Sequence, residues 1–295
     1  MTVVTAVGSR PLRRRRPTVP RIGWIGTAIL GGFAALALAA PLLAPYRATA
    51  LSGRPLEPPS LAHLMGTNAV GQDLFTQLLS GVRAAMFVAV VAGSGAALLG
   101  GSIGVLAGWW GGVVDLVVMR AADVLLVIPR LPLLIVIVAY AGPGLGTRST
   151  VIALTFWPEA AKVLRAQVRS LRHRDHLTAA TGFGAGPSHS LRRHVVPEVG
   201  LVVASALVAA AGRAVMLEVG LAFLGLGDPN QASWGSIVRD ALKFQGLFFT
   251  RAWAWWLLPP LLATGLLLAG ITFIGLAAER WVNPRLVRHL SGGRP

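Results

Sequence analysis

Long uncharged apolar runs set the fold class of this chain. Residues 22–44 and 84–108 contain no Asp, Glu, Lys or Arg, and each is longer than the about 20 helical residues that cross a ~30 Å hydrocarbon core. Backbone polar groups in lipid must be paired within a helix or a closed barrel, and the roughly ten-residue alternating segments of a barrel are absent. Apolar residues make up 54% of the sequence, too many for a soluble domain. The sequence therefore predicts an all-α, polytopic membrane protein.

Six segments are expected to cross the membrane. They are residues 22–44, 84–108, 116–141, 149–168, 198–222 and 252–277. Trp109 and Trp110 follow the second segment and Trp253 lies at the start of the last, as in the aromatic belts of membrane interfaces. The longer polar connections, 45–83 and 223–251, then lie on one side of the bilayer, and the basic connection 169–197 lies on the other.

Lysines and arginines near the ends of these spans are divided unevenly between the two sides. If the N-terminus is inside, 17 of them lie on the inner side and 7 on the outer side. Positive residues accumulate in cytoplasmic loops, so we expect both termini and the loop 169–197 in the cytoplasm. A formal net charge of +16 would suggest nucleic-acid binding in a soluble chain. Here the basic residues lie mostly near the ends of apolar runs, so we expect no nucleic-acid partner.

The N-terminal region permits a second interpretation. A basic tail, an apolar run and Ala48-Thr49-Ala50 are together similar to a secretory signal with its cleavage site. The apolar run has 23 residues, which exceeds the about 7–15 residues of a signal's apolar region. We therefore expect residues 1–21 to be a disordered cytoplasmic tail, followed by an uncleaved first span.

Several kinds of chemistry are excluded by the sequence. No cysteine is present, which removes disulfides, thiolate metal sites and cysteine nucleophiles. A phosphate-binding loop G-x-x-x-x-G-K-[ST] needs a lysine after glycine, but the two lysines, Lys162 and Lys243, follow Ala161 and Leu242. The histidine pairs at 173/176 and 189/194 lie among arginines without carboxylates at ligand spacing, so no metal site is expected. The chain itself is not expected to hydrolyse ATP.

The segment Gly100-Gly-Ser102-Ile-Gly104 matches the nucleophile pattern G-x-S-x-G. An intramembrane serine hydrolase would need a histidine base beside Ser102, and all six histidines fall outside the predicted spans. The alternative is structural, because glycines recur at positions 100, 104, 108 and 112. Such a stripe of small residues lets two membrane helices approach closely, and we favour this interpretation.

Charged residues inside the predicted spans are candidate functional positions. Each costs about 2.5–3.5 kcal/mol at a helix centre on insertion scales. The set is Arg120, Asp123, Glu159, Arg213 and Glu218. These residues either form an inter-helix polar network that fixes packing or line a water-filled pathway. Arg120 and Asp123 are three residues apart and can partly neutralise each other, which favours a structural role for that pair.

Four blocks of sequence resemble one family, the C-type permease subunit of dipeptide and oligopeptide ABC importers, which also contains nickel-import subunits. The first block is Met65-Gly-Thr-Asn-Ala-Val-Gly-Gln-Asp-Leu-Phe with Gly81-Val-Arg-Ala-Ala, and the second is Asp115, Met119-Arg120, Asp123 and Ile128-Pro129. The third is the Ala-Ala…Gly loop that begins at Asp175 and ends at Val196-Pro197. The fourth runs from Glu218-Val-Gly to Ser233-Trp-Gly, and then includes Trp255-Trp256, Pro259 and Pro284-Arg285.

The resemblance implies a type I ABC importer transmembrane domain in a bacterial cell membrane. Its coupling loop would dock on an ATPase through Asp175, Leu177, Ala179, Ala180, Gly184, Ala185 and Pro197. The implied partners are a second homologous permease, two ABC ATPase subunits, an extracytoplasmic peptide-binding lipoprotein and membrane lipids. No cofactor would be bound by this chain, since ATP with Mg would lie on the ATPases. Peptides are the expected cargo, with nickel or another small solute as the alternative.

The resemblance also implies a division of the chain. Residues 1–21 form the tail, 22–64 the first helix with its outer linker, 65–283 the permease core and 284–295 a second cytoplasmic tail. The sequence departs from the family pattern at several positions, which are Asn68, Gln72, Ala85, Thr178 and Arg130. Asn68 and Gln72 replace an acid and a base, so the polar contacts of that outer segment are an open question. Arg130 is an unexpected charge in an apolar stretch.

Overall fold

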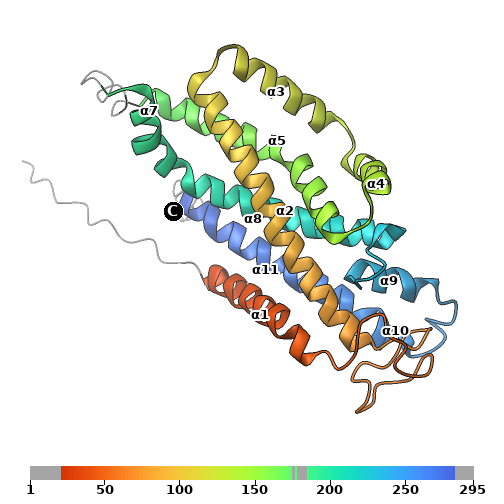
Figure 1. Ribbon diagram of the computed structural model, residues 1–295. Helices are drawn as coiled ribbons and strands as arrows, with labels where there is room; N and C mark the ends of the chain where they lie inside the picture. Colours follow the sequence, from red (N-terminus) through yellow and green to blue (C-terminus); the bar gives the residue numbers. More distant parts are fainter. Residues whose placement is uncertain (1–20, 175–176, 178–184, 283–295) are drawn as a thin grey trace, which may run out of the picture.

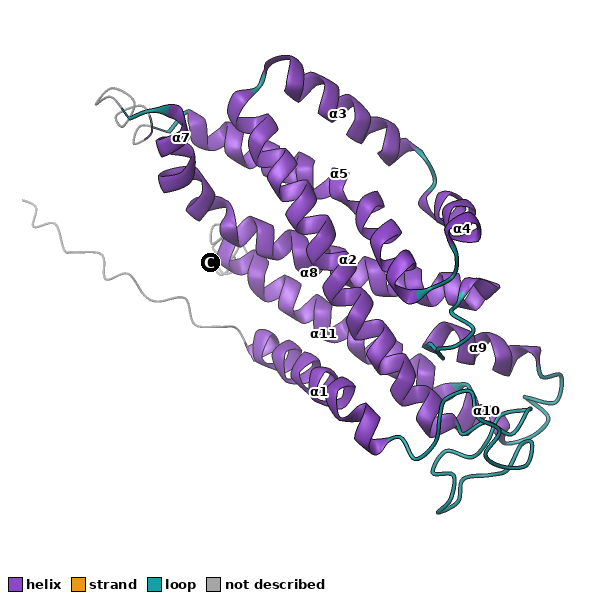
Figure 2. Ribbon diagram, in the orientation of Figure 1, coloured by secondary structure: helices purple, strands orange, loops and turns teal. Residues whose placement is uncertain are grey.

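The computed structural model describes residues 21–174, 177 and 185–282, and this part of the chain is helical apart from connections and two isolated bridges. The described helices are α1 (Arg21–Leu43), α2 (Leu74–Trp110), α3 (Gly112–Val127), α4 (Arg130–Ala141), α5 (Leu145–Arg172), α7 (Pro187–Ser190), η1 (Leu191–Val195), α8 (Val196–Leu221), η2 (Ala222–Leu226), α9 (Trp234–Lys243), α10 (Ala252–Trp256) and α11 (Leu258–Val282). Most of the long helices lie alongside one another in one bundle (Figures 1 and 2). The all-α prediction is confirmed.

The bundle has two distinct ends. The first residues of α1, the helix α7 and the last turns of α11 lie toward one end, which we call the α7 end (Figure 1). The long connections 44–73 and 227–251, with α9 and α10, gather at the other, which we call the α10 end. The segments that were predicted to share a side of the bilayer therefore share an end of the bundle.

Length and composition support fewer spans than the six predicted. Four of the described helical segments qualify by themselves, Arg21–Leu43, Leu74–Trp110, Pro187–Leu226 and Ala252–Glu279. The bent pair of α3 and α4 adds a fifth if it counts as one span. Helix α5 does not qualify, because Arg148, Glu159 and Lys162 lie within its first 18 residues.

The prediction of one continuous third span over 116–141 is wrong. Helix α3 ends at Val127 and α4 begins at Arg130, and the two are bent by 93° relative to each other. Proline disfavours the helical conformation of the residue before it, and Ile128 accordingly has an extended ψ of 127°. Pro129 itself lacks an N–H to continue the helix. The Ile-Pro pair therefore splits this segment into two shorter helices.

Helix α2 is longer than the predicted span 84–108. It begins ten residues earlier, at Leu74, so residues 74–83 are helical rather than part of a polar connection. Asp73 is its N-cap, and the carboxylate accepts a hydrogen bond of 2.8 Å from the Thr76 N–H. At about 1.5 Å per residue, this 37-residue helix extends well beyond a hydrocarbon core of about 30 Å.

The glycine stripe of α2 packs within the chain itself. A Cβ on Gly100 or Gly104 would collide with the carbonyl oxygen of Trp157 or Ala161 in α5, and one on Gly108 would lie 2.9 Å from the Arg165 carbonyl oxygen. The prediction of a close helix–helix approach is confirmed for these three glycines. Gly112 is different, because it begins α3 with φ of +66° and a Cβ added there would meet nothing within 4 Å.

The chain enters α8 through a π-helix, whose turns are wider than those of an α-helix. The helix α7, the π-helix η1 and α8 follow one another without a connecting loop, and the second π-helix, η2, follows α8. Pro197 lies in the first turn of α8, and its ring would clash with the carbonyl four residues earlier in a regular helix. That carbonyl belongs to Arg193 in η1, where the wider turn relieves the clash. Among the described residues of the predicted loop 169–197, those outside a helix are 173, 174, 185 and 186.

Candidate functional site

The α7 end of the bundle holds the segment that was predicted to dock on an ATPase. Leu177 is buried in an apolar cluster with Leu171 of α5, Leu191 and Val195 of η1, and Val199 of α8. Its N–H donates to the Arg174 carbonyl at 3.0 Å. The loop is thus anchored at this point to the end of α5 and the start of α8.

The other predicted loop residues divide into two groups. Ala185 lies just before α7 and is partly exposed, and Pro197 is exposed in the first turn of α8. Asp175, Ala179, Ala180 and Gly184 lie outside the described residues, as does the departure at Thr178. Gly186 and Pro187 begin α7, since Gly186 is its N-cap and proline is favoured in a first helical turn.

Acidic and basic residues pair along α5 from the α7 end toward the middle of the bundle. Nearest that end, Asp115 of α3 accepts hydrogen bonds from the Arg165 guanidinium, one of them 2.6 Å long. Arg169 lies 3.7 Å from the same carboxylate. A bidentate arginine–carboxylate pair of this kind fixes both distance and orientation. It ties the N-terminal half of α3 to α5.

Asp123 of α3 pairs mainly with a residue of α5, and only loosely with Arg120 of its own helix. Its carboxylate lies 2.5 Å from Lys162 Nζ and 4.0 Å from Arg120 Nη1. The Arg120 side chain is 78% exposed. The predicted Arg120–Asp123 pair therefore exists but is loose, and Lys162 is the stronger partner that spacing within one helix did not reveal.

Glu159 joins three helices near the middle of α5. It forms ion pairs with Arg130 at the start of α4 and with Arg213 of α8, whose Nη2 lies 2.7 Å from Glu159 Oε2. Both guanidinium groups lie over the ring of Phe156. The unexpected charge at Arg130 thus has a partner, and the helix break at Ile128-Pro129 puts it at the first position of α4, beside α5.

Glu218 and Arg148 form a fully buried pair near the α10 end. Arg148 Nη1 donates to Glu218 Oε1 at 2.9 Å, and both side chains are 1% exposed. The pair joins the first turn of α5 to the last turn of α8. The pair therefore lies inside the protein. Of the predicted polar residues, Glu159 and Arg213 contact each other, whereas Arg120, Asp123 and Glu218 do not join that cluster.

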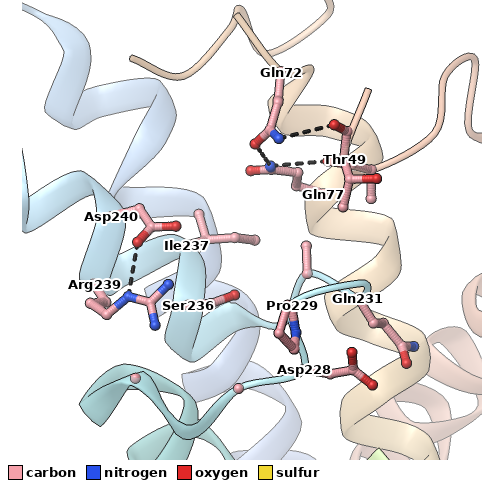
Figure 3. A pocket seen from close by; sticks show the side chains of 14 residues that line it. Thr49, Gln72, Gln77, Asp228, Pro229, Gln231, Ser236, Ile237, Arg239 and Asp240 are labelled. Atoms are coloured by element: carbon pink, nitrogen blue, oxygen red, sulfur yellow. Dashed lines mark hydrogen bonds and ion pairs between the residues drawn. The ribbon is translucent and has the colours of Figure 1, made fainter. Parts of the chain in front are cut away.

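A polar cavity of about 280 Å³ lies at the α10 end, between the start of α2 and the connection after η2 (Figure 3). Gln77 Nε2 donates to Gln72 Oε1 at 2.8 Å and Gln72 Nε2 donates to the Thr49 carbonyl at 3.1 Å on one wall. Asp228 and Asp240 lie on the other wall, and Asp240 is paired with Arg239. This cavity was not predicted, since its residues come from three separate segments.

In the segment before α2, two amide side chains pair with each other. Asn68 Nδ2 donates to Gln72 Oε1 at 2.8 Å, and Asn68 Oδ1 accepts from the Gln72 N–H. The amide pair thus takes the positions of the acid and base expected there. Nearby, buried His63 lies 2.9 Å from the Asp73 carboxylate, which also caps α2. These contacts order the segment that covers the start of α2.

Ser102 lies on an apolar groove of about 740 Å³ between α2 and the α7–α8 segment. None of the described residues that line this groove is a histidine. Ser188 and Arg192 also line the groove. The arrangement offers Ser102 no base of the kind that activates a serine nucleophile.

Comparison with known proteins identifies the family. Residues 100–288 match the model of the binding-protein-dependent transport system inner membrane component. A Brucella suis biovar 1 protein described as a peptide permease is 34% identical over 251 residues, which cover 83% of this chain and 81% of that protein. A second Brucella suis protein, described as a peptide transport system permease, is 33% identical over 95% of this chain and 94% of its own length. A dipeptide transport system permease protein of Alkalihalophilus pseudofirmus is 29% identical over 90% and 86%. This chain therefore belongs to the family of binding-protein-dependent transport system inner membrane components.

Proposed function

We propose that this chain is one of two permease subunits of an ABC importer for dipeptides and oligopeptides. The observation that carries the cargo class is the group of relatives described as peptide or dipeptide permeases, which match 83–95% of the chain. ATP and Mg would be bound by two separate ATPase subunits, and a lipoprotein outside the membrane would deliver the peptide. Since the family is one of transport subunits, the alternative of an intramembrane serine hydrolase at Ser102 is wrong.

The proposed topology has six crossings with both termini in the cytoplasm. The bent pair α3–α4 and the charged helix α5 would be the two crossings that composition alone does not identify. Two ion pairs between α3 and α5, Lys162–Asp123 and Arg165–Asp115, neutralise part of their charge, which lowers the cost of placing these helices in a membrane. On this view the four parts expected from the sequence, 1–21, 22–64, 65–283 and 284–295, are tail, first helix with linker, permease core and tail.

The proposed coupling mechanism uses the α7 end. The loop around Ala185 would sit in a groove of an ATPase. Leu177 would hold the loop to the bundle through its apolar contacts with α5, η1 and α8. Movement of the ATPases on binding ATP would shift α7 and the helix that continues from it. Such a shift would bias the bundle between inward-open and outward-open states. The cavity at the α10 end would face the loaded lipoprotein.

Topology can be tested with single thiols, because the chain has no cysteine. Leu61→Cys, in the exposed segment before α2, should react with a membrane-impermeant maleimide in intact cells. Ala185→Cys should react only after permeabilisation. Reaction of the Ala185 variant in intact cells would contradict the proposed orientation and the proposed coupling role together.

Docking can be tested with the same Ala185→Cys variant and a single cysteine on a candidate ATPase. A disulfide crosslink that changes on addition of ATP is expected in membranes that contain the whole importer, and Leu61→Cys should give none. Gly184→Leu should abolish association with the ATPase while membrane insertion is retained, and Ala179→Cys offers a second crosslinking position. An unchanged pull-down of ATPase with Gly184→Leu would count against the coupling loop.

Cargo can be tested by uptake in proteoliposomes that contain the two permeases, the ATPases and the binding protein. ATP-dependent accumulation of a radiolabelled dipeptide, without accumulation of radioactive nickel, is expected. The reverse result would reject peptides and assign the importer to nickel.

A further inference from the structure

The three-helix cluster at Glu159 carries an unbalanced positive charge. Arg130 and Arg213 contribute two positive charges and Glu159 one negative charge, so the cluster has a net charge of +1. No other Asp or Glu among the described residues forms an ion pair with either arginine in this structure. By contrast, Arg148 and Glu218 balance each other one to one. An unbalanced charge among membrane helices is costly and marks a functional position.

Phe156 holds the two arginines in place. The guanidinium carbons of Arg130 and Arg213 lie 4.4 Å and 5.3 Å from the centroid of its ring. The ring itself is buried in the core formed by α2, α4, α5 and α8. A guanidinium group over an aromatic face is attracted by the ring quadrupole. The two charged groups are therefore positioned before any ligand arrives.

Arg213 is the more accessible arginine of the cluster. The Arg213 side chain is 45% exposed, compared with 22% for Arg130 and 28% for Glu159. Ala209 and Met216, four residues before and three residues after Arg213, are also exposed, so the three share one face of α8. That face offers a guanidinium group beside an apolar surface of the same helix.

We propose that Arg213 and Arg130, held over Phe156, form a binding site for the C-terminal carboxylate of a peptide in transit. This inference rests on the proposed transport of peptides and adds a substrate-binding site to it. A guanidinium group matches the geometry of a carboxylate and can donate two parallel hydrogen bonds to it. Every linear peptide with a free C-terminus carries this group, whatever its side chains. A site for it would recognise peptides as a class.

Glu159 sets the strength of the proposed site. It neutralises one of the two positive charges, so a passing carboxylate would meet a net charge of +1 rather than +2. A pathway must bind its cargo well enough to admit it and weakly enough to release it. Glu159 thus weakens binding enough for the peptide to be released, in addition to joining α4, α5 and α8.

The test uses a thiol beside the cluster in the whole importer. Met216→Cys is introduced into complexes whose other subunits are free of cysteine, and reaction rates are compared for an anionic and a cationic methanethiosulfonate reagent. With Arg213→Gln added, the ratio of anionic to cationic rates should fall about fivefold, because one positive charge near the thiol is removed. Arg213→Lys should retain the ratio, and Arg83→Gln, which removes an exposed arginine near the start of α2, should leave it unchanged.

The ligand class is tested in the same complexes without a second substitution. Millimolar Ala-Ala dipeptide should slow the reaction of the introduced thiol with the anionic reagent, and the C-terminal amide of the same dipeptide should not. The proposal would be overturned if acid and amide protected the thiol equally. It would also be overturned if Arg213→Gln left the ratio of anionic to cationic rates unchanged. If Arg213→Gln instead releases the second permease on purification, the charge belongs to a subunit interface and the proposal is also rejected.

Failure of the proposed function would look different. In that case the parent complex would not import the dipeptide at all in the proteoliposome assay. Failure of the carboxylate site alone would leave import by the parent intact while acid and amide give equal protection.

Discussion

Replacing Glu218 with leucine is expected to lower the free energy of unfolding by about 3–5 kcal/mol, because it leaves the Arg148 guanidinium buried without its partner. Arg148→Met is expected to have an effect of similar size. Both side chains are 1% exposed, so water cannot take over the lost contact. The measurement is the thermal midpoint of a fluorescent fusion in mild detergent, read by size-exclusion chromatography after heating.

The double variant Arg148→Met with Glu218→Leu separates charge from shape. Replacing a buried ion pair by apolar residues of similar volume is often neutral or stabilising, so much of the lost stability should return. A matched control is Arg120→Gln, whose side chain is exposed and lies 4.0 Å from its partner. That change should cost less than about 1 kcal/mol. A double variant as unstable as the singles would show that the pair has a role beyond neutralising charge.

Alanine in place of Gly104 is expected to lower the free energy of unfolding by about 1–3 kcal/mol. The added methyl group would meet the backbone carbonyl of Ala161 in α5, and backbone cannot move aside as a flexible side chain can. Leucine at this position should prevent the two helices from packing. The same heated-detergent assay applies, and the yield of monodisperse protein is a second readout.

Gly101→Ala is the matched control for the glycine prediction. It is the same change in the same helix, but the added methyl group would lie 3.6 Å from Val203 Cγ2, an ordinary contact. In a helix interior, alanine is favoured over glycine by roughly 0.5–1 kcal/mol. Gly101→Ala should therefore be neutral or stabilising. Equal destabilisation by both changes would show that α2 does not depend on its approach to α5.

The parts of the fold that the sequence predicts well are those fixed by local composition. Residues 22–44 are uncharged and residues 198–222 are mostly apolar with three charged residues, and each segment forms a helix close to its predicted bounds. The start of α2 was missed because residues 74–83 mix polar and apolar types, and its cap is a single side chain, Asp73. The break at Ile128-Pro129 had a visible signal in the proline. A proline disfavours the helical conformation of the residue before it, so this position favours a helix end.

The candidate site was less predictable, because its pairs are long-range. Arg130 and Glu159 are 29 residues apart and Arg148 and Glu218 are 70 residues apart. Spacing along one helix could suggest only Arg120 with Asp123, which turned out to be the looser contact. The glycine stripe indicated a close approach but not the partner helix. Knowledge of which helices are neighbours would have supplied all of these contacts.

One further consequence follows from the helical path between the two ends of the bundle. Pro187 to Leu226 is helical with wider turns near its start, and it is interrupted near its finish at Gly225, where φ is +96° and the cavity lined by Gly225 and Asp228 begins. Backbone hydrogen bonds hold helical residues at a fixed rise along the axis, and π-turns widen this ladder locally. A displacement of Pro187 along the helix axis would therefore reach the break at Gly225, beside the far cavity.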